Sequence, residues 1–89
     1  MQLSDKHVGY RLKKARRRMG LTQHQVMKAL GLKSPTRLSQ WEKGQRLPGV
    51  RNILKLSILY KTLPDELLFE IREQALQSIK SYHSQINPP

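Results

Sequence analysis

Apolar residues recur at every third or fourth position along most of the chain, a spacing that predicts helices rather than strands. The first helix is expected over residues 5–19, where Ser4 can serve as the N-cap and Gly20 ends the element. One face of this helix is apolar and predicts the side that packs in a core; its residues are Val8, Leu12, Ala15 and Met19.

Two shorter helices are expected next, separated by only a few residues with a glycine at the turn. The earlier one begins after the N-cap Thr22 and ends at Gly31. The later one is capped by Ser34, has Pro35 at its first helical position and ends at Gly44. Two helices joined by so short a turn are typical of a helix-turn-helix.

The second half of the chain predicts two more helices, from about Gly49 to about Tyr60 and from Pro64 to about Tyr82. Apolar residues of the fourth helix are Val50, Ile53, Leu54, Ile58 and Leu59. The fifth carries a long apolar stripe, formed by Leu67, Leu68, Ile71, Ala75, Ile79 and Tyr82. Residues 84–89 are polar and end in two prolines, which predicts a disordered tail.

The third helix has an unusually polar outer face. On a helical wheel Leu38 and Trp41 point to the core, and the opposite face carries Thr36, Ser39, Gln40 and Lys43. In a helix-turn-helix that face lies in the DNA major groove, where hydroxyl, amide and ammonium groups meet base edges. An ordinary solvated surface helix would be equally polar, so this pattern alone leaves both interpretations open.

The distribution of charge favours a polyanionic partner. The formal net charge is +11, but residues 1–61 hold 15 basic and 2 acidic residues, whereas residues 62–89 hold 2 basic and 4 acidic ones. A basic body of +13 beside an acidic segment of −2 is typical of proteins that bind nucleic acid. Charge can also serve solubility alone.

Several classes of protein are not indicated. The 89 residues suffice for one domain, and a chain without cysteine offers no disulfide or thiolate metal site. No apolar run reaches the length of a membrane helix, so a cytoplasmic protein is expected. The histidines at positions 7, 24 and 83 match no metal-binding or catalytic motif, so we expect neither an enzyme nor a cofactor.

Residues 8–68 resemble the Cro/CI-type helix-turn-helix DNA-binding family, also called the Xre family. The resemblance rests on "RLKKARRRMGLTQHQVMKALGL", "LSQWEKGQRLP" and "LYKTLPDELL", which occur in the family's order and at nearly its spacing. It implies an all-α fold, a compact five-helix bundle of the lambda-repressor-like type, here with an extended C-terminal helix. It also implies a transcriptional regulator, most often a repressor, that reads duplex DNA with the helix at about residues 35–43.

The family's functional positions can be carried over onto this chain. Those that match its base-reading places are Pro35, Thr36, Ser39 and Gln40. Because Pro35 has no N–H to donate, Arg37 joins Thr36 and Gln40 as an expected reader, although its place on the flank of the helix also suits a phosphate. Positions that match phosphate contacts are Thr22, Gln23, Lys43, Gln45 and Arg46. Arg16 and Glu42 match a structural salt bridge.

The organisation that follows has three parts: a DNA-binding domain over residues 1–69, a C-terminal helix extension over residues 70–83, and the tail over residues 84–89. The extension is a candidate seam for a homodimer, which would align two recognition helices one DNA turn apart. Two alternatives stay open. One is an antitoxin-like or adapter protein whose C-terminal helix binds a protein partner, and the other is DNA binding without sequence preference, driven by charge.

Overall fold

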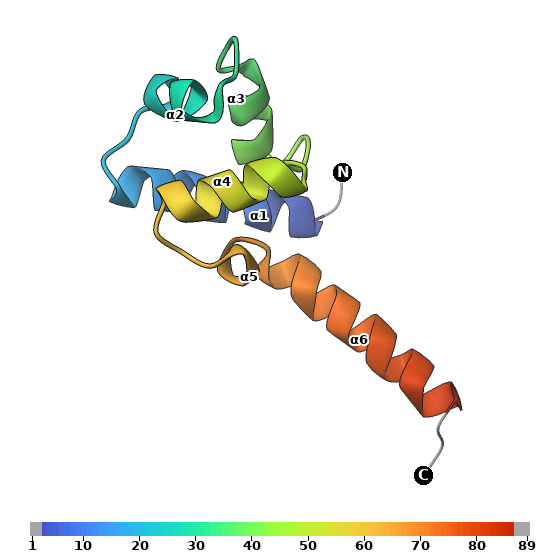
Figure 1. Cartoon of the computed structure of the whole chain (residues 1–89). Coiled ribbons are helices and arrows are strands. Elements are labelled where there is room, and N and C mark those ends of the chain that lie inside the picture. The colour runs from blue at the N-terminus through green and yellow to red at the C-terminus, as the bar shows by residue number, and fades with distance from the viewer. Residues whose placement is uncertain (1–2, 87–89) are drawn as a thin grey trace.

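The computed structural model describes residues 3–86, which contain α-helices and no strands (Figure 1). The helices in chain order are α1 (Leu3–Arg18), α2 (Gln23–Leu30), α3 (Thr36–Glu42), α4 (Val50–Leu59), α5 (Pro64–Leu67) and α6 (Phe69–Ile86). In the view of Figure 1, α2 and α3 lie on one side of α1 and α4, and α5 and α6 lie on the other side. The all-α fold expected from the sequence is confirmed.

The limits of the first three helices follow local sequence signals, with two corrections. Thr22 is the N-cap of α2 and Gly31 its left-handed C-cap, as expected. Ser4 does not cap α1, because α1 already begins at Leu3 and Ser4 lies buried within it. Ser34 does not cap α3 either. The carbonyl of Pro35 accepts the first helical hydrogen bond, from Ser39 N at 2.9 Å, so Pro35 itself occupies the N-cap position.

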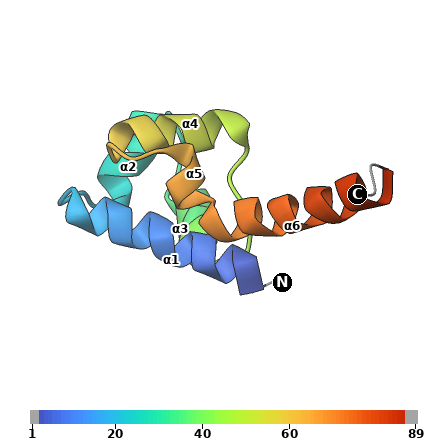
Figure 2. The ribbon, with the colours of Figure 1, turned by 90° about the horizontal axis from the view of Figure 1, so that it is seen from below.

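The expected single helix over residues 64–82 is divided in two. The backbone leaves helical geometry at Leu68, which ends the short α5 and allows α6 to run in a new direction. The bend lets Leu67 enter the core with 2% of its surface exposed, while α6 leaves the body (Figure 2). Packing of Leu67 against the bundle therefore outweighs the helical continuity that the apolar stripe suggests.

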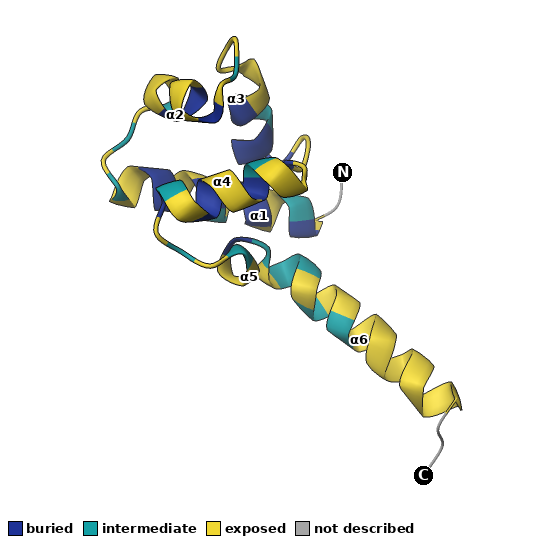
Figure 3. Cartoon of the chain, in the orientation of Figure 1, coloured by how far each residue is buried: buried dark blue, intermediate teal, exposed yellow. Residues whose placement is uncertain are grey.

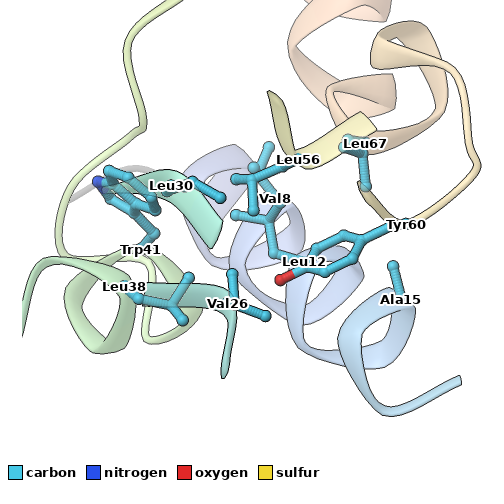
Figure 4. Close-up of a cluster of buried hydrophobic side chains, with 10 residues drawn as sticks. All are labelled: Val8, Leu12, Ala15, Val26, Leu30, Leu38, Trp41, Leu56, Tyr60 and Leu67. Atoms are coloured by element: carbon cyan, nitrogen blue, oxygen red, sulfur yellow. The ribbon is translucent and has the colours of Figure 1, made fainter. Parts of the chain in front are cut away.

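The core is built from α1–α5 and the residue that follows α4 (Figure 4). Its side chains are Val8, Leu12, Ala15, Val26, Leu30, Leu38, Trp41, Leu56, Tyr60 and Leu67. Tyr60 is fully buried, and its hydroxyl has no hydrogen-bond partner among the described residues. Burial raises the pKa of Tyr60, because the surrounding apolar side chains disfavour the phenolate.

Helix α1 and helix α3 pack against each other at Gly9. A Cβ atom on Gly9 would lie only 2.6 Å from the carbonyl oxygen of Glu42 and 2.7 Å from that of Trp41. The missing side chain allows the end of α3 to rest directly on the backbone of α1. This contact sets the distance between α1 and the C-terminal end of α3.

Two apolar surfaces remain uncovered (Figure 3). Of the apolar residues in α4, Ile53 and Leu56 are buried, but Val50, Leu54 and Ile58 form an exposed row. Helix α6 contributes no buried residue, and the second half of its stripe, Ile79, Tyr82 and Ile86, is exposed.

Helix α6 is longer than expected. Residues 84–86 were expected to be disordered but form its last turn, whereas residues 87–89 lie outside the described residues. Between residues 3 and 86, no helix combines the length and apolar character needed to cross a membrane.

Candidate nucleic-acid interface

A shallow hollow of about 410 Å³ lies between the start of α2 and the outer face of α3. It is lined by Gln23, Pro35, Thr36, Ser39, Gln40, Lys43 and Gln45. The lining offers amides, hydroxyls and one ammonium group, and it includes no carboxylate. Such a surface can donate hydrogen bonds to phosphates, and its amides and hydroxyls can both donate to and accept from base edges.

Helix α3 divides sharply into a core side and an outer side. Leu38 is fully buried and Trp41 is 3% exposed, so their side chains anchor the helix in the core. Thr36 and Lys43 are exposed, and Gln40 is partly exposed. The alternation places Thr36, Ser39 and Gln40 of α3 together in the hollow with Lys43, as the helical wheel predicts.

The loop after α3 is held close to the helix. Gly44 adopts a left-handed conformation at φ 72°, which turns the chain back. The backbone N–H groups of Gln45 and Arg46 then donate to the carbonyl of Gln40, at 2.9 and 3.4 Å. This anchoring leaves both side chains exposed beside the end of α3.

The start of α2 is closed by a reciprocal capping box. Thr22 Oγ1 accepts from Gln25 N at 3.1 Å, and Gln25 Oε1 accepts from Thr22 N at 2.9 Å. The Thr22 hydroxyl is therefore engaged within the protein. Thr22 remains exposed but does not line the hollow, whereas its neighbour Gln23 does.

A buried ion pair lies directly behind the hollow. Arg16 Nε donates to Glu42 Oε2 at 2.7 Å, and the guanidinium also donates to the carbonyl of Leu21 at 2.8 Å. The hydrogen bonds to Glu42 raise the pKa of Arg16, although its burial opposes them. Gln23 Nε2 donates to Glu42 Oε1 at 3.0 Å and so connects this pair to the surface.

The residues that the sequence predicts as a site are only partly gathered. The hollow contains Thr36, Ser39 and Gln40 of the expected base readers, with Gln23, Lys43 and Gln45 of the expected phosphate contacts. Arg37 instead lines a neighbouring hollow of about 430 Å³, together with Gly31, Leu32, Lys33 and Ser34. Thr22 and Arg46 line neither hollow.

Comparison with known proteins agrees with this geometry. A family described as "Helix-turn-helix" matches residues 12–67, which include α2, α3 and the hollow between them. The chain belongs to the Cro/CI-type (Xre) helix-turn-helix family. As a member of this family, it is a DNA-binding transcriptional regulator. Among curated proteins, none matches the chain at a significant level.

Solved structures with the same fold include two bacterial regulators. The restriction-modification controller protein C.AhdI from Aeromonas hydrophila is 34% identical, with a TM-score of 0.63, covering 70% of this chain and 92% of its own. A structure of the clp gene regulator ClgR from Corynebacterium glutamicum is 18% identical, with a TM-score of 0.69, covering 99% of this chain and 98% of its own. The second match extends over nearly the whole chain, including the residues of α6.

One feature of the site had no sequence signal. Gln23 and Glu42 are 19 positions apart, and nothing in their spacing indicates that their side chains meet. Only the packing of α3 across α1 brings the Glu42 carboxylate to the first residue of α2. Within residues 3–86 there is no group of acidic, histidine or cysteine side chains that could hold a metal ion.

Proposed function

We propose that this regulator binds a specific duplex sequence by placing α3 in the major groove, and that it acts as a repressor in the cytoplasm. The observation that carries this proposal is the carboxylate-free polar hollow between α2 and α3, on a chain whose residues 1–61 carry a formal charge of +13. Charge draws the duplex to this face, and the polar side chains select the sequence.

In this proposal, base reading belongs to the outer face of α3. Gln40 can pair bidentately with adenine, and Thr36 and Ser39 can exchange hydrogen bonds with several bases. Pro35 lines the same hollow and offers only apolar contact, which suits a thymine methyl group. Arg37 stands at the flank, where either a guanine edge or a phosphate lies within the reach of a long side chain.

Phosphate contacts belong to the two ends of the hollow in this proposal. At one end, the capped start of α2 presents Thr22, Gln23 and the backbone N–H groups of Gln23 and His24, which the capping box does not use. At the other end, Lys43, Gln45 and Arg46 follow one another beside the end of α3. These groups would fix the register of α3 on the duplex.

We further propose a homodimer in which residues 70–83 form the seam, while residues 1–69 form the DNA-binding domain. Support comes from the uncovered stripe of α6, where Ala75, Ile79, Tyr82 and Ile86 follow spacings of four, three and four residues. That alternation is the spacing of a two-helix seam. A two-fold arrangement would present two copies of α3 to a pseudo-palindromic site.

The same uncovered stripe favours one alternative function. In an antitoxin-like or adapter protein, α6 would dock on another protein, and DNA binding would serve autoregulation or be secondary. This alternative requires the same exposed residues but no sequence selection by α3.

Selection of bound duplexes from a random DNA pool, near physiological salt, tests the proposed function. Enrichment of a pseudo-palindrome with half-sites one turn apart is the expected result. The matched control is the double variant Ser39→Ala/Gln40→Ala, which should retain binding but lose the enriched sequence. Binding without enrichment in the wild type would indicate charge-driven binding, and no binding would favour the adapter.

A further inference from the structure

Glu42 is a buried carboxylate that serves two partners at once. Its Oε2 atom accepts from Arg16 Nε at 2.7 Å, and its Oε1 atom accepts from both Arg16 Nη2 at 3.1 Å and Gln23 Nε2 at 3.0 Å. Only 3% of its side chain is exposed. One acidic group thus joins α1, α3 and the first residue of α2.

The bond to Glu42 determines which way the Gln23 amide faces. A carboxylate can only accept hydrogen bonds, so the nitrogen end of the amide must point to Glu42. Because Gln23 also lines the hollow, its carbonyl oxygen and its second N–H are left for a ligand there. A glutamine without this bond would sample both amide orientations and several rotamers.

An ion pair that served stability alone would not need this third bond. Buried ion pairs contribute little to folding, since the cost of removing two charges from water offsets most of their attraction. The Arg16–Glu42 pair instead reaches outward through Gln23, the only residue that both lines the hollow and hydrogen-bonds Glu42 within residues 3–86.

We propose that Glu42 is a positioning residue for DNA binding, which holds the Gln23 amide ready for a phosphate or base before the duplex arrives. The inference rests on the proposed function and adds a role to a residue that the sequence indicates as purely structural. Pre-organisation of this kind strengthens binding because the side chain has no freedom left to lose.

The test uses the double variant Arg16→Met/Glu42→Leu. It removes the carboxylate without changing the net charge, and replacing a buried ion pair by apolar residues of similar volume is usually compatible with folding. Its affinity is compared with those of the wild type, Gln23→Ala and the triple variant. The probe is a fluorescent duplex that carries the sequence enriched in the selection experiment.

If Glu42 acts through Gln23, the double variant and Gln23→Ala should each bind about 5- to 10-fold more weakly, the range of one hydrogen bond. The triple variant should then bind no more weakly than Gln23→Ala alone. The salt dependence of binding should be the same for all four proteins, because Gln23 carries no charge and releases no counterion.

Arg11→Met/Glu70→Leu is the matched control, because it removes the other ion pair of α1 that reaches a distant helix. When Arg11→Met/Glu70→Leu is combined with Gln23→Ala, the loss of binding free energy should equal the sum of the losses caused by the two changes separately. Additive effects of Arg16→Met/Glu42→Leu and Gln23→Ala, or unchanged affinity of the former, would overturn the proposal.

A measurement on the free wild-type protein covers the case in which the double variant does not fold. The side-chain amide protons of Gln23 should exchange with water more slowly than those of Gln77, which is exposed on α6. Equal exchange would overturn the positioning role. A wild type that binds no DNA would refute the proposed function, whereas DNA binding with additive variants would refute only this inference.

Discussion

Gln40 is the side chain of α3 best suited to read a base. It lies partly exposed in the hollow, on a helix fixed by Leu38 and Trp41, so its amide approaches DNA from a rigid support. Gln40→Ala should lose preference at one position per half-site, a discrimination of about 1–3 kcal/mol, while affinity for unrelated duplexes stays nearly unchanged. Selection and sequencing with the variant would check this, and an unchanged motif would contradict the assignment.

Arg46 has the opposite expected signature, because it is exposed outside the hollow and its backbone is tied to Gln40. Arg46→Ala should weaken binding to all duplexes alike and lower the slope of log affinity against log salt by about 1. Titrations of two unrelated duplexes at several salt concentrations provide the measurement. A loss confined to the selected sequence would instead assign Arg46 to base reading.

Among the helices, the contact of α1 with α3 depends on the absence of one side chain. Gly9→Ala should reduce the free energy of unfolding by about 2 kcal/mol, because the new methyl group would press on the carbonyls of Trp41 and Glu42. This cost exceeds the gain of about 1 kcal/mol that alanine usually brings to a helix. Chemical denaturation measures the difference.

Gly49→Ala is the control for this prediction, because no atom beyond the adjacent residues lies within 4 Å of the added Cβ and the φ of Gly49 is −71°. Gly49→Ala should lower the free energy of unfolding by less than about 1 kcal/mol, the usual effect of replacing an N-cap residue. Equal destabilisation by the two variants would mean that the close approach of α1 and α3 is not the cause.

The attachment of α6 to α1 should depend on pH. Arg11 donates three hydrogen bonds of 2.8–3.0 Å to Glu70 and lies over the ring of Phe69 at 5.0 Å. These bonds lower the pKa of Glu70, although its partial burial opposes them. A lowered pKa means that the pair stabilises the fold fully above the ordinary glutamate range, and that this contribution is lost as the pH falls through the folded pKa.

Glu70→Gln should therefore be less stable than wild type at neutral pH, and the difference should vanish in strong acid. Because Arg11 is 40% exposed, we expect a difference of no more than about 1 kcal/mol. Denaturation curves at several pH values would show it. A difference that persists unchanged at low pH would mean that the ionised carboxylate does not hold α6.

At the scale of the whole molecule, α6 makes the chain elongated, with extents of 52 × 26 × 20 Å. Deletion of residues 74–89 retains Glu70 and Ile71, which contact the body, and removes residues 74–83, the greater part of the proposed seam. The truncated protein should sediment as a monomer, with less than half the mass of the wild-type dimer, and lose affinity for paired half-sites more than for a single one.

Ile58→Asp in the full chain is the matched control, because it places a charge in the other uncovered surface, the row on α4, where Ile58 is 78% exposed. It should leave the oligomeric state unchanged. A truncated protein that remains dimeric, or an Ile58→Asp variant that dissociates, would move the seam from α6 to α4.

Much of the fold was predictable because its determinants are local. Helical spacing, the N-cap Thr22 and the glycines at positions 31 and 44 act within a few residues, so the helix-turn-helix follows from the sequence. The exception is the start of α3, where Pro35 and not Ser34 is the N-cap. The gathering of Thr36, Ser39 and Gln40 follows in the same way, since they share one short helix whose other face must be buried.

Other features depended on contacts between distant segments. The stripe over residues 64–82 is compatible with one straight helix. The helix is interrupted at Leu68 because Leu67 packs into the core against the other helices, which the local pattern does not indicate. Similarly, local pattern does not tell the buried Leu56 from the exposed Leu54 and Ile58, because apolar residues surround α4 on most sides. The neighbours decide which of them are covered.

The sequence by itself determined the helix-turn-helix, its polar outer face and the basic body, because periodicity, capping and charge are properties of the chain. Tertiary structure alone decided that α6 leaves the body and that Gln23 meets Glu42. The physical reason is that hydrogen bonds and burial across 19 or more residues depend on how helices cross, which no local pattern encodes.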